Sequence, residues 1–146
     1  MNMELRTASA ADVETLFEIR TSVVQNHLSR EQMAGLGITP EALTSIIAQE
    51  PCAWIAHCDG TAAGFAMVDS EIGEIFALFI RPGFEGLGIG RALLARAEEY
   101  LFQRHELIWL VTDGSPQIRA NGFYQRLGWQ RIARLDERDV RYEKHR

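Results

Sequence analysis

The spacing of apolar side chains predicts strand, helix and helix again in the first fifty residues. Polar and apolar positions alternate from Met3 to Thr7 as in a short strand. Ser9 and Asp12 then form a capping-box pattern that starts a helix. Its apolar positions recur at helical spacing and are Val13, Leu16, Phe17, Val23 and Val24. A second helix is predicted over Pro40 to Gln49, because proline suits a first helical position, while residues 28–39 have no firm period.

The middle of the chain has the pattern of three strands followed by a helix. Two β-type runs, Cys52 to Cys58 and Thr61 to Asp69, flank Asp59-Gly60, and both residues of this pair tolerate positive φ. We therefore expect an antiparallel hairpin. A third run, Glu74 to Arg81, reaches a glycine-rich turn, and apolar positions at helical spacing then predict a helix from Gly88 to Arg104.

Another strand and helix are predicted after residue 106. Leu107 to Thr112 is short and almost entirely apolar, which is typical of a central strand buried on both faces. Ser115 and Pro116 suit the cap and the first position of a helix, which we expect to end near Leu127-Gly128.

The last part of the chain predicts a hairpin, and the composition fits one globular domain. Trp129 to Leu135 and Val140 to Glu143 resemble strands joined by the polar turn of residues 136–139. With 146 residues, 47% of them hydrophobic and 24% charged, the chain suits a single domain spanning 1–146 without disulfides or metals to support its core. The mixture of strands and helices predicts an α/β fold.

The charge pattern argues against nucleic acid as a partner. The net charge is -5, and acidic and basic residues are interspersed, so no surface is expected to neutralise many phosphates. The basic residues after 130 are diluted by acids, as on a solvated hairpin face. We find no signal-peptide pattern at the start and no apolar run of about 18 residues. A cytoplasmic protein without membrane contact is expected.

The two cysteines predict neither a disulfide nor a metal site. Cys52 and Cys58 lie in one predicted strand, where extended chain holds their Cα atoms on the order of 20 Å apart. No second cluster of metal ligands accompanies His57, and no CxxC spacing occurs. We therefore expect a reducing compartment and no bound metal.

The segment RPGFEGLGIGRALL, Arg81 to Leu94, carries the strongest chemical signal. A glycine-rich turn at a helix start exposes free backbone N–H groups and the positive end of the helix dipole, which suits a diphosphate. A tight turn that allows close helix packing is the alternative interpretation. The GxGxG spacing is not the dinucleotide fingerprint, and no GK[ST] follows, so a nicotinamide enzyme or an ATPase is disfavoured.

Two motifs resemble those of the GNAT superfamily of N-acetyltransferases. The stretch from Ile75 through Leu94 resembles its acyl-CoA-binding motif, a strand, then [QR]xxGx[GA], then a helix. The pattern falls on Glu85, Gly88 and Gly90. Glu85 stands where the family usually has Gln or Arg, and a carboxylate beside a diphosphate is repulsive unless it points away.

The second motif is the segment QIRANGFYQRLGW, Gln117 to Trp129. It resembles the family pattern NxxAxxFYxxxGF at Ala120, Phe123, Tyr124, Gly128 and, conservatively, Trp129. Gln117 stands where Asn is usual. The resemblance covers roughly residues 53–135, whereas the first fifty residues match only in their pattern of strand and helices.

The resemblance implies a GNAT-like acyl-CoA N-acyltransferase fold, with a mixed, twisted sheet flanked by helices and the coenzyme wedged where central strands splay apart. Backbone N–H groups of a bulged strand at Leu78, Phe79 and Ile80 would hold the pantetheine arm and the thioester carbonyl. Arg81 and Arg91 could offset the phosphate charge. The remaining coenzyme contacts would be Glu85, Gly86, Leu87, Gly88, Ile89, Gly90, Arg91, Gln117, Ala120 and Phe123.

The same resemblance implies acetyl transfer from acetyl-CoA to a primary amine, with a small-molecule acceptor preferred. Tyr124 matches the family tyrosine that protonates the leaving thiolate, and a phenol stays protonated at neutral pH. Glu74 is the candidate base, acting directly or through water, although a water chain is an alternative. Thr112 occupies the position where some relatives have a glutamate. The acceptor pocket would involve the polar residues Arg20, Asn26, His27 and Arg30.

A second hypothesis is a non-catalytic acyl-CoA-binding regulatory module that kept the turn and lost turnover. The departure at Glu85 and the unidentified base keep this alternative open. The expected partners are acetyl-CoA and an amine acceptor. An exposed edge strand in the final hairpin is a candidate for pairing in a homodimer.

Overall fold

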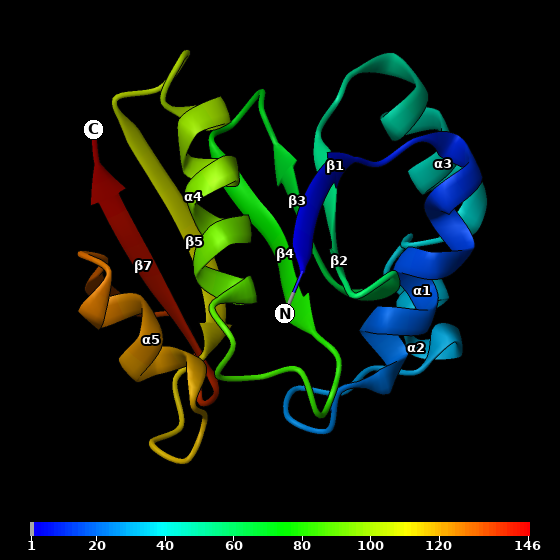
Figure 1. The fold of residues 1–146 in the computed structure, drawn as a ribbon. Coiled ribbons are helices and arrows are strands. Elements are labelled where there is room, and N and C mark those ends of the chain that lie inside the picture. The colour runs from blue at the N-terminus through cyan, green and yellow to red at the C-terminus, as the bar shows by residue number, and fades with distance from the viewer. Residues whose placement is uncertain (1) are drawn as a thin grey trace.

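One mixed sheet runs through the centre of the molecule (Figure 1). The computed structural model describes residues 2–146, and its sheet has the strand order β1-β2-β3-β4-β5-β7-β6. The strands are β1 (Met3–Thr7), β2 (Ala53–Cys58), β3 (Thr61–Asp69), β4 (Glu74–Ile80), β5 (Leu107–Asp113), β6 (Gln130–Arg134) and β7 (Asp139–His145). The helices are η1 (Ala10–Asp12), α1 (Val13–Ser22), α2 (Arg30–Gly35), α3 (Pro40–Gln49), α4 (Ile89–Leu101) and α5 (Ala120–Arg126).

Strand directions divide the sheet at its middle. The strands β1 to β4 pair antiparallel in chain order, and β7 pairs antiparallel with both β5 and β6. Between these halves, β4 and β5 run parallel. The hairpin predicted from Asp59-Gly60 is confirmed, with φ of 51° and 84° at its two turn residues.

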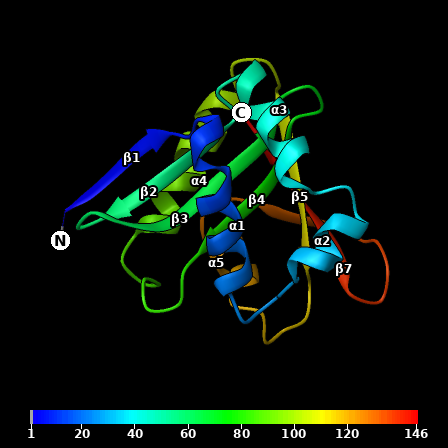
Figure 2. The same cartoon turned by 90° about the vertical axis from the view of Figure 1, so that its right-hand side faces the viewer.

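Helices cover both faces of this sheet, as Figure 2 shows from the side. Helices α4 and α5 lie on one face, and α1, α2 and α3 lie on the other. The predicted α/β fold, a mixed sheet flanked by helices, is confirmed.

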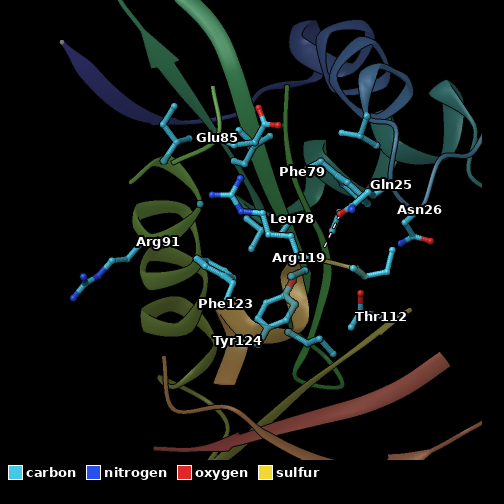
Figure 3. A pocket seen from close by; sticks show the side chains of 18 of the residues that line it. Gln25, Asn26, Leu78, Phe79, Glu85, Arg91, Thr112, Arg119, Phe123 and Tyr124 are labelled. Atoms are coloured by element: carbon cyan, nitrogen blue, oxygen red, sulfur yellow. Dashed lines mark hydrogen bonds between the residues drawn. The ribbon is translucent and has the colours of Figure 1, made fainter. Parts of the chain in front are cut away.

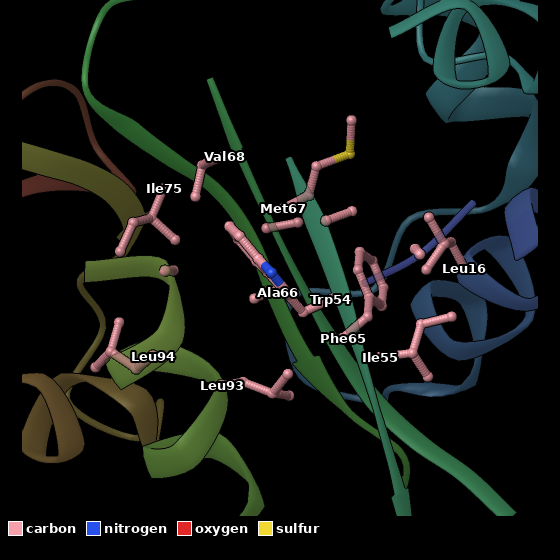
Figure 4. Close-up of a cluster of buried hydrophobic side chains, with 14 of the residues drawn as sticks. Leu16, Trp54, Ile55, Phe65, Ala66, Met67, Val68, Ile75, Leu93 and Leu94 are labelled. Carbon is pink, nitrogen blue, oxygen red and sulfur yellow. The ribbon is translucent and has the colours of Figure 1, made fainter. Parts of the chain in front are cut away.

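The hydrophobic core lies on both sides of β3 (Figure 4). Leu93 of α4 packs on one side, and Leu16 of α1 packs near Phe65 on the other; all three are at most 4% exposed. Gly64 allows the close approach of β4, because a Cβ there would lie 2.7 Å from Ile80 Cδ1 and 2.9 Å from the Phe79 carbonyl oxygen. This half of the sheet is therefore tightly packed.

Two expectations for the N-terminal helices need correction. Helix α1 ends at Ser22, so Val23 and Val24 belong to the following loop, and Val24 is 83% exposed. The stretch without a firm period contains α2, whose Ser29 cap accepts a hydrogen bond from the Gln32 backbone N–H at 3.1 Å. Helical spacing alone continued the first helix too far, because Val23 adopts an extended backbone.

The predicted helix start at Ser115-Pro116 is wrong, because α5 begins at Ala120. The buried Asn121 side-chain amide donates to three backbone carbonyls in the preceding turn, those of Asp113, Ser115 and Ile118, at 2.9 to 3.3 Å. Its oxygen accepts from the Tyr142 hydroxyl at 2.8 Å. These bonds stabilise a turn in residues 115–119, so the helix starts later.

Strand β5 is also less buried than predicted. Ile108 and Leu110 are buried, but Val111 is 36% exposed and Trp109 and Thr112 are half-buried. One face and one edge of β5 therefore remain accessible.

Cys52 lies just before β2 and Cys58 is its last residue, and both are buried free thiols. Burial, together with the nearby Glu50 charge, raises the pKa of Cys52 to about 11. Across residues 2–146, no helix has the length and apolar character needed to cross a membrane.

Candidate active site

The two central strands separate immediately after they meet. Over the described residues, β4 and β5 pair at a single position, Glu74 with Trp109. On the β3 side, the register passes from Val68–Ile75 to Met67–Ala77, so Phe76 is an extra residue on β4. Such a bulge bends its strand, and β4 diverges from β5 beyond it. The result is a cleft of about 700 Å³ between the two strands.

The edge of β4 that faces this cleft carries free backbone groups. Alternate residues of a strand direct their N–H and C=O groups to opposite edges, and β3 pairs with only one edge of β4. Leu78, Phe79 and Ile80 line the cleft and have no strand partner on the β5 side. The structure thus brings the predicted pantetheine-binding segment to an open sheet edge.

The glycine turn forms one end of the cleft. Gly86 and Gly88 have φ of 75° and 86°, values that glycine adopts without strain, and Gly88 precedes the first residue of α4. The first turn of α4 contains no acidic side chain. The backbone N–H groups of Ile89, Gly90 and Arg91 have no intrahelical acceptor there and line the cleft at the positive end of the helix dipole.

The charged side chains near this turn do not all lie as predicted. Glu85 uses its carboxylate within its own loop, where Oε1 accepts from the Gly83 N–H at 2.6 Å. Arg81 donates to the Ala62 carbonyl at 2.7 Å and lies 3.9 Å from Glu18. The side chain of Arg91 points away from the cleft (Figure 3). A role of Arg81 and Arg91 in offsetting charge at the turn therefore stays a prediction.

Arg119 is a cleft arginine that no sequence motif had indicated. This residue comes just before α5 and lines the cleft beside the glycine turn. Its Nη2 lies 3.8 Å from the position that a Cβ on Gly86 would occupy. The Arg119 backbone N–H donates to Gln25 Oε1 at 3.3 Å, a bond drawn in Figure 3.

Tyr124 occupies the cleft floor on α5 and is 6% exposed. Its ring packs against three aromatic rings, those of Phe123, Trp129 and Tyr142, with centroids 5.4 to 6.1 Å apart. No hydrogen bond to its hydroxyl is formed within residues 2–146, and the hydroxyl faces the cleft (Figure 3). Burial raises the pKa of this phenol, so it remains protonated at neutral pH.

Glu74 lies where β4 and β5 meet and is half-buried. Burial raises the pKa of its carboxyl, and the nearby Asp69 charge adds to this, while Arg141 opposes it. Its side chain does not line the cleft, and neither do Leu87 and Gln117. The other predicted coenzyme residues and Tyr124 do line it.

The open end of the cleft is formed by the loop after α1 and by β5. Val23, Val24, Gln25 and Asn26 line it from the loop, and Phe76, Val111 and Thr112 line it from the strands. Among the polar residues predicted for an acceptor site, only Asn26 reaches the lining. Arg30 pairs with Glu14 and stacks on Phe17, and His27 is exposed.

Arg20 lies beneath this loop and is 9% exposed. Its guanidinium stacks 4.1 Å from the Phe79 ring centroid, and Nη2 donates to the Asn26 carbonyl at 3.0 Å. Burial lowers the pKa of this guanidinium. Nη1 has no hydrogen-bond partner among the described residues. Arg20 thus holds the backbone of the loop that forms the open end of the cleft.

Residues 16–129 match the model of the acetyltransferase (GNAT) family. This match covers most of the chain, and the protein belongs to the GNAT acetyltransferase family.

Relatives of this family are similar over part of the chain. Over 79 residues it is 35% identical to an uncharacterised N-acetyltransferase of Archaeoglobus fulgidus, covering 48% of this chain and 54% of that protein. Over 86 residues it is 35% identical to the mycothiol acetyltransferase of Beutenbergia cavernae, covering 55% of this chain and 29% of that protein. The matched stretches thus span about half of these relatives or less.

Solved structures share the whole fold. The PaiA N-acetyltransferase of Thermoplasma acidophilum, in complex with coenzyme A, superposes with a TM-score of 0.81 at 22% identity and full coverage of both chains. The ribosomal-protein-S18-alanine N-acetyltransferase of Escherichia coli gives a TM-score of 0.75 at 17% identity, covering 99% of this chain and 94% of that one. Both similarities concern the fold.

Proposed function

We propose that the protein transfers an acetyl group from acetyl-CoA to a primary amine of a small molecule. The observation that carries this proposal is the cleft between β4 and β5, which combines unpaired strand-edge amides, a free helix N-terminus and an unpaired phenol hydroxyl. These three features match the three parts of an acyl-CoA, which are its pantetheine amides, its pyrophosphate and its thioester sulfur. Family membership supports the same assignment.

In this proposal the coenzyme binds mainly through backbone groups. The β4 edge at Leu78 to Ile80 pairs with the pantetheine arm and polarises the thioester carbonyl. The amides between Gly86 and Arg91 bind the pyrophosphate, as a helix N-terminus does for anions. Phe123 supports this end of the cleft, because its ring lies 3.5 Å from a Cβ position on Gly90.

The chemical step needs one base and one acid. The neutral amine attacks the thioester carbon, the C–S bond breaks, and the departing thiolate takes the proton of the Tyr124 hydroxyl. Burial favours the neutral phenol, so Tyr124 keeps that proton until the thiolate forms. Glu74 accepts the amine proton through water, because its carboxyl lies behind the cleft lining. Its raised pKa brings it closer to the pH at which a general base is effective.

A small acceptor is supported by the shape and chemistry of the open end. Gln25 ties the loop after α1 to the turn before α5, with Nε2 donating to the Gln117 carbonyl at 3.1 Å, and this bridge closes one side of the opening. The residues contributed by the loop, together with Phe76, Val111 and Thr112, carry no charged side chain. We therefore expect an amine whose neighbouring groups are apolar or neutral.

The test is an acceptor screen with acetyl-CoA. Aliphatic diamines, amino acids, aryl-alkylamines and a short peptide are each incubated with enzyme and acetyl-CoA, and free thiol is followed. We expect thiol release that depends on one amine class and an acetylated product of matching mass. Calorimetric coenzyme binding without release in any arm would instead indicate a binding module. Absence of binding would refute the coenzyme site itself.

A further inference from the structure

We propose that the Arg119 side chain binds the pyrophosphate of the coenzyme, and that Gln25 couples this contact to the acceptor loop of residues 23–26. This inference rests on the proposed function, because it assigns a role within the same cleft. It names a phosphate ligand outside the glycine turn and a physical link between the two substrate sites.

The first support is the position and freedom of the Arg119 guanidinium. It lies beside Gly86, with Nη2 3.8 Å from the position of a Cβ there, and forms no hydrogen bond or ion pair with any residue in 2–146, whereas the guanidinium of Arg81 is engaged elsewhere. The Arg119 guanidinium thus lies next to the glycine turn that leads into the free amides at the start of α4, and both line the cleft. A guanidinium fork and backbone amides together are well suited to a doubly charged diphosphate.

The second support is the way the Arg119 backbone is held. The Gln25 side-chain amide donates to the Gln117 carbonyl at 3.1 Å and accepts from the Arg119 N–H at 3.3 Å. One amide group therefore bonds to a carbonyl and an N–H two residues apart, as a neighbouring strand would. Figure 3 shows Gln25 reaching from its loop to Arg119. This two-point contact joins segments more than ninety residues apart in sequence.

The consequence is a link between coenzyme and acceptor sites. A phosphate that fixes the Arg119 side chain also restricts the Arg119 backbone. Because Gln25 is hydrogen-bonded to that backbone, the motion of the acceptor loop, residues 23–26, is then restricted as well. Coenzyme binding should therefore order the acceptor loop before any acceptor is present.

The phosphate contact is tested by calorimetry on Arg119→Gln. Charge-assisted hydrogen bonds are strong, so we expect the Kd of coenzyme A to rise about 10- to 100-fold, with Arg119→Lys in between. The loss should be the same for 3′-dephospho-coenzyme A and absent for pantetheine. The matched control is Arg96→Gln, which removes an exposed arginine on α4 outside the cleft lining and should bind coenzyme normally.

Three other calorimetric results would contradict the proposed role of Arg119. Normal coenzyme binding by a folded Arg119→Gln variant, with its melting temperature unchanged, would overturn the role of Arg119. A loss that disappears with 3′-dephospho-coenzyme A would move the contact to the 3′-phosphate and overturn the pyrophosphate assignment. Absence of coenzyme binding by the wild-type protein would refute the proposed function, and this inference with it.

The link is tested by hydrogen exchange with coenzyme A as the only ligand. We expect coenzyme to slow amide exchange in residues 23–26 of the wild-type protein. Gln25→Leu keeps the approximate size of the side chain but removes both the donor to the Gln117 carbonyl and the acceptor of the Arg119 N–H, so this protection should be lost while coenzyme still binds. Equal protection in the wild type and in Gln25→Leu would overturn the coupling, even if Arg119 binds phosphate.

Discussion

The two edges of β4 serve opposite purposes. On one edge, β4 pairs with β3 from Glu74 to Ile80, and the absence of a side chain at Gly64 lets the two strands pack closely. On the other edge, the parallel pairing with β5 stops after Glu74. The first edge contributes to the stability of the fold, and the second leaves its hydrogen-bonding groups without strand partners beyond Glu74. The cleft therefore forms where β4 stops pairing with β5, while β3 pairs with the other edge of β4 along its length.

Two tyrosines show the same contrast in their side chains. Tyr100 of α4 lies on the packed side, where its hydroxyl donates to Glu50 Oε2 at 2.6 Å. Tyr124 lies on the cleft side, and its hydroxyl has no partner in the described part of the chain. A satisfied hydroxyl stabilises the native protein, whereas an unsatisfied one at a cleft is available for chemistry.

The largest expected effect is a loss of turnover in Tyr124→Phe, for which Tyr100→Phe is the matched control. Tyr124→Phe should lower kcat about 10²- to 10⁴-fold, because it removes the proton donor, with coenzyme binding and melting temperature unchanged. Tyr100→Phe should keep kcat and lose about 1 kcal/mol of unfolding free energy. Thiol release, calorimetry and urea denaturation measure the three quantities. Full turnover in Tyr124→Phe would show that another group protonates the thiolate.

A smaller effect on rate is expected for Glu74→Gln, with kcat/KM falling about 10²-fold. Because burial raises the pKa of Glu74, the acidic limb of the wild-type pH profile should lie above the ordinary glutamate pKa of about 4.3 and disappear in the variant. The exposed neighbour Glu71 offers the matched control, Glu71→Gln, which should keep the wild-type profile.

The same pKa shift predicts a stability difference. A raised folded pKa means that Glu74 favours folding below its unfolded pKa and loses this contribution as the pH rises through the folded value. Glu74→Gln should therefore melt at least as high as the wild type at pH 7, and the gap should close below about pH 4. A lower melting temperature at pH 7 would mean that the ionised carboxylate has a structural partner.

Alanine at two glycines should separate the two edges of β4. Gly64→Ala forces a methyl group against the Phe79 carbonyl and should cost about 1–3 kcal/mol of unfolding free energy without changing coenzyme affinity. Gly88→Ala strains a left-handed position with open space around it and should raise the coenzyme Kd about tenfold by disturbing the amides of α4. Equal effects of both variants on both quantities would contradict the division proposed here.

The smallest effect is expected far from the cleft, at Asp12. This carboxylate binds Arg6 through both oxygens, at 2.8 and 2.7 Å, which holds its pKa well below the usual range. Arg6 is 46% exposed, so solvent screens the pair, and Asp12→Asn should cost about 1 kcal/mol at pH 7.

The sign of the pH dependence follows from the lowered pKa of Asp12. Its contribution is present above the unfolded pKa of about 3.9 and is lost as the pH falls through the folded value, so wild type and Asp12→Asn should converge in acid. Denaturation curves at pH 7 and pH 3 should show this gap beginning to narrow, because pH 3 lies below the unfolded pKa but above the lowered folded pKa, and the acetyltransfer rate should not change. A rate loss in Asp12→Asn would show that the packed region also controls the cleft.

Features set by single residues and short motifs could be predicted from the sequence. The Asp59-Gly60 hairpin and the strand, glycine turn and helix around Gly88 depend on local backbone preferences, and both are found. The second motif also located Tyr124 in the cleft. Local rules suffice where the cause of a structure lies within a few residues of it.

The errors have causes that are distant in sequence. The start of α5 depends on Asn121 and on its bond to Tyr142 of β7, and no local pattern at Ser115-Pro116 reveals this contact. Arg119 and Gln25 are hydrogen-bonded although 94 residues separate them, so neither local pattern could predict this contact. The sequence signal for Arg119 was its position in the second motif, as a cation immediately before the first residue of α5.

Cys52 and Cys58 are buried, so the native protein should contribute little colour when free thiol is measured with an aromatic disulfide reagent. Aromatic disulfide reagents react with thiolates, and the pKa of about 11 at Cys52 keeps that sulfur protonated, while Cys58 is 5% exposed. Colour formed at neutral pH therefore counts only the released carrier. A second, slower rise in a heated sample would report protein denaturation in the same cuvette.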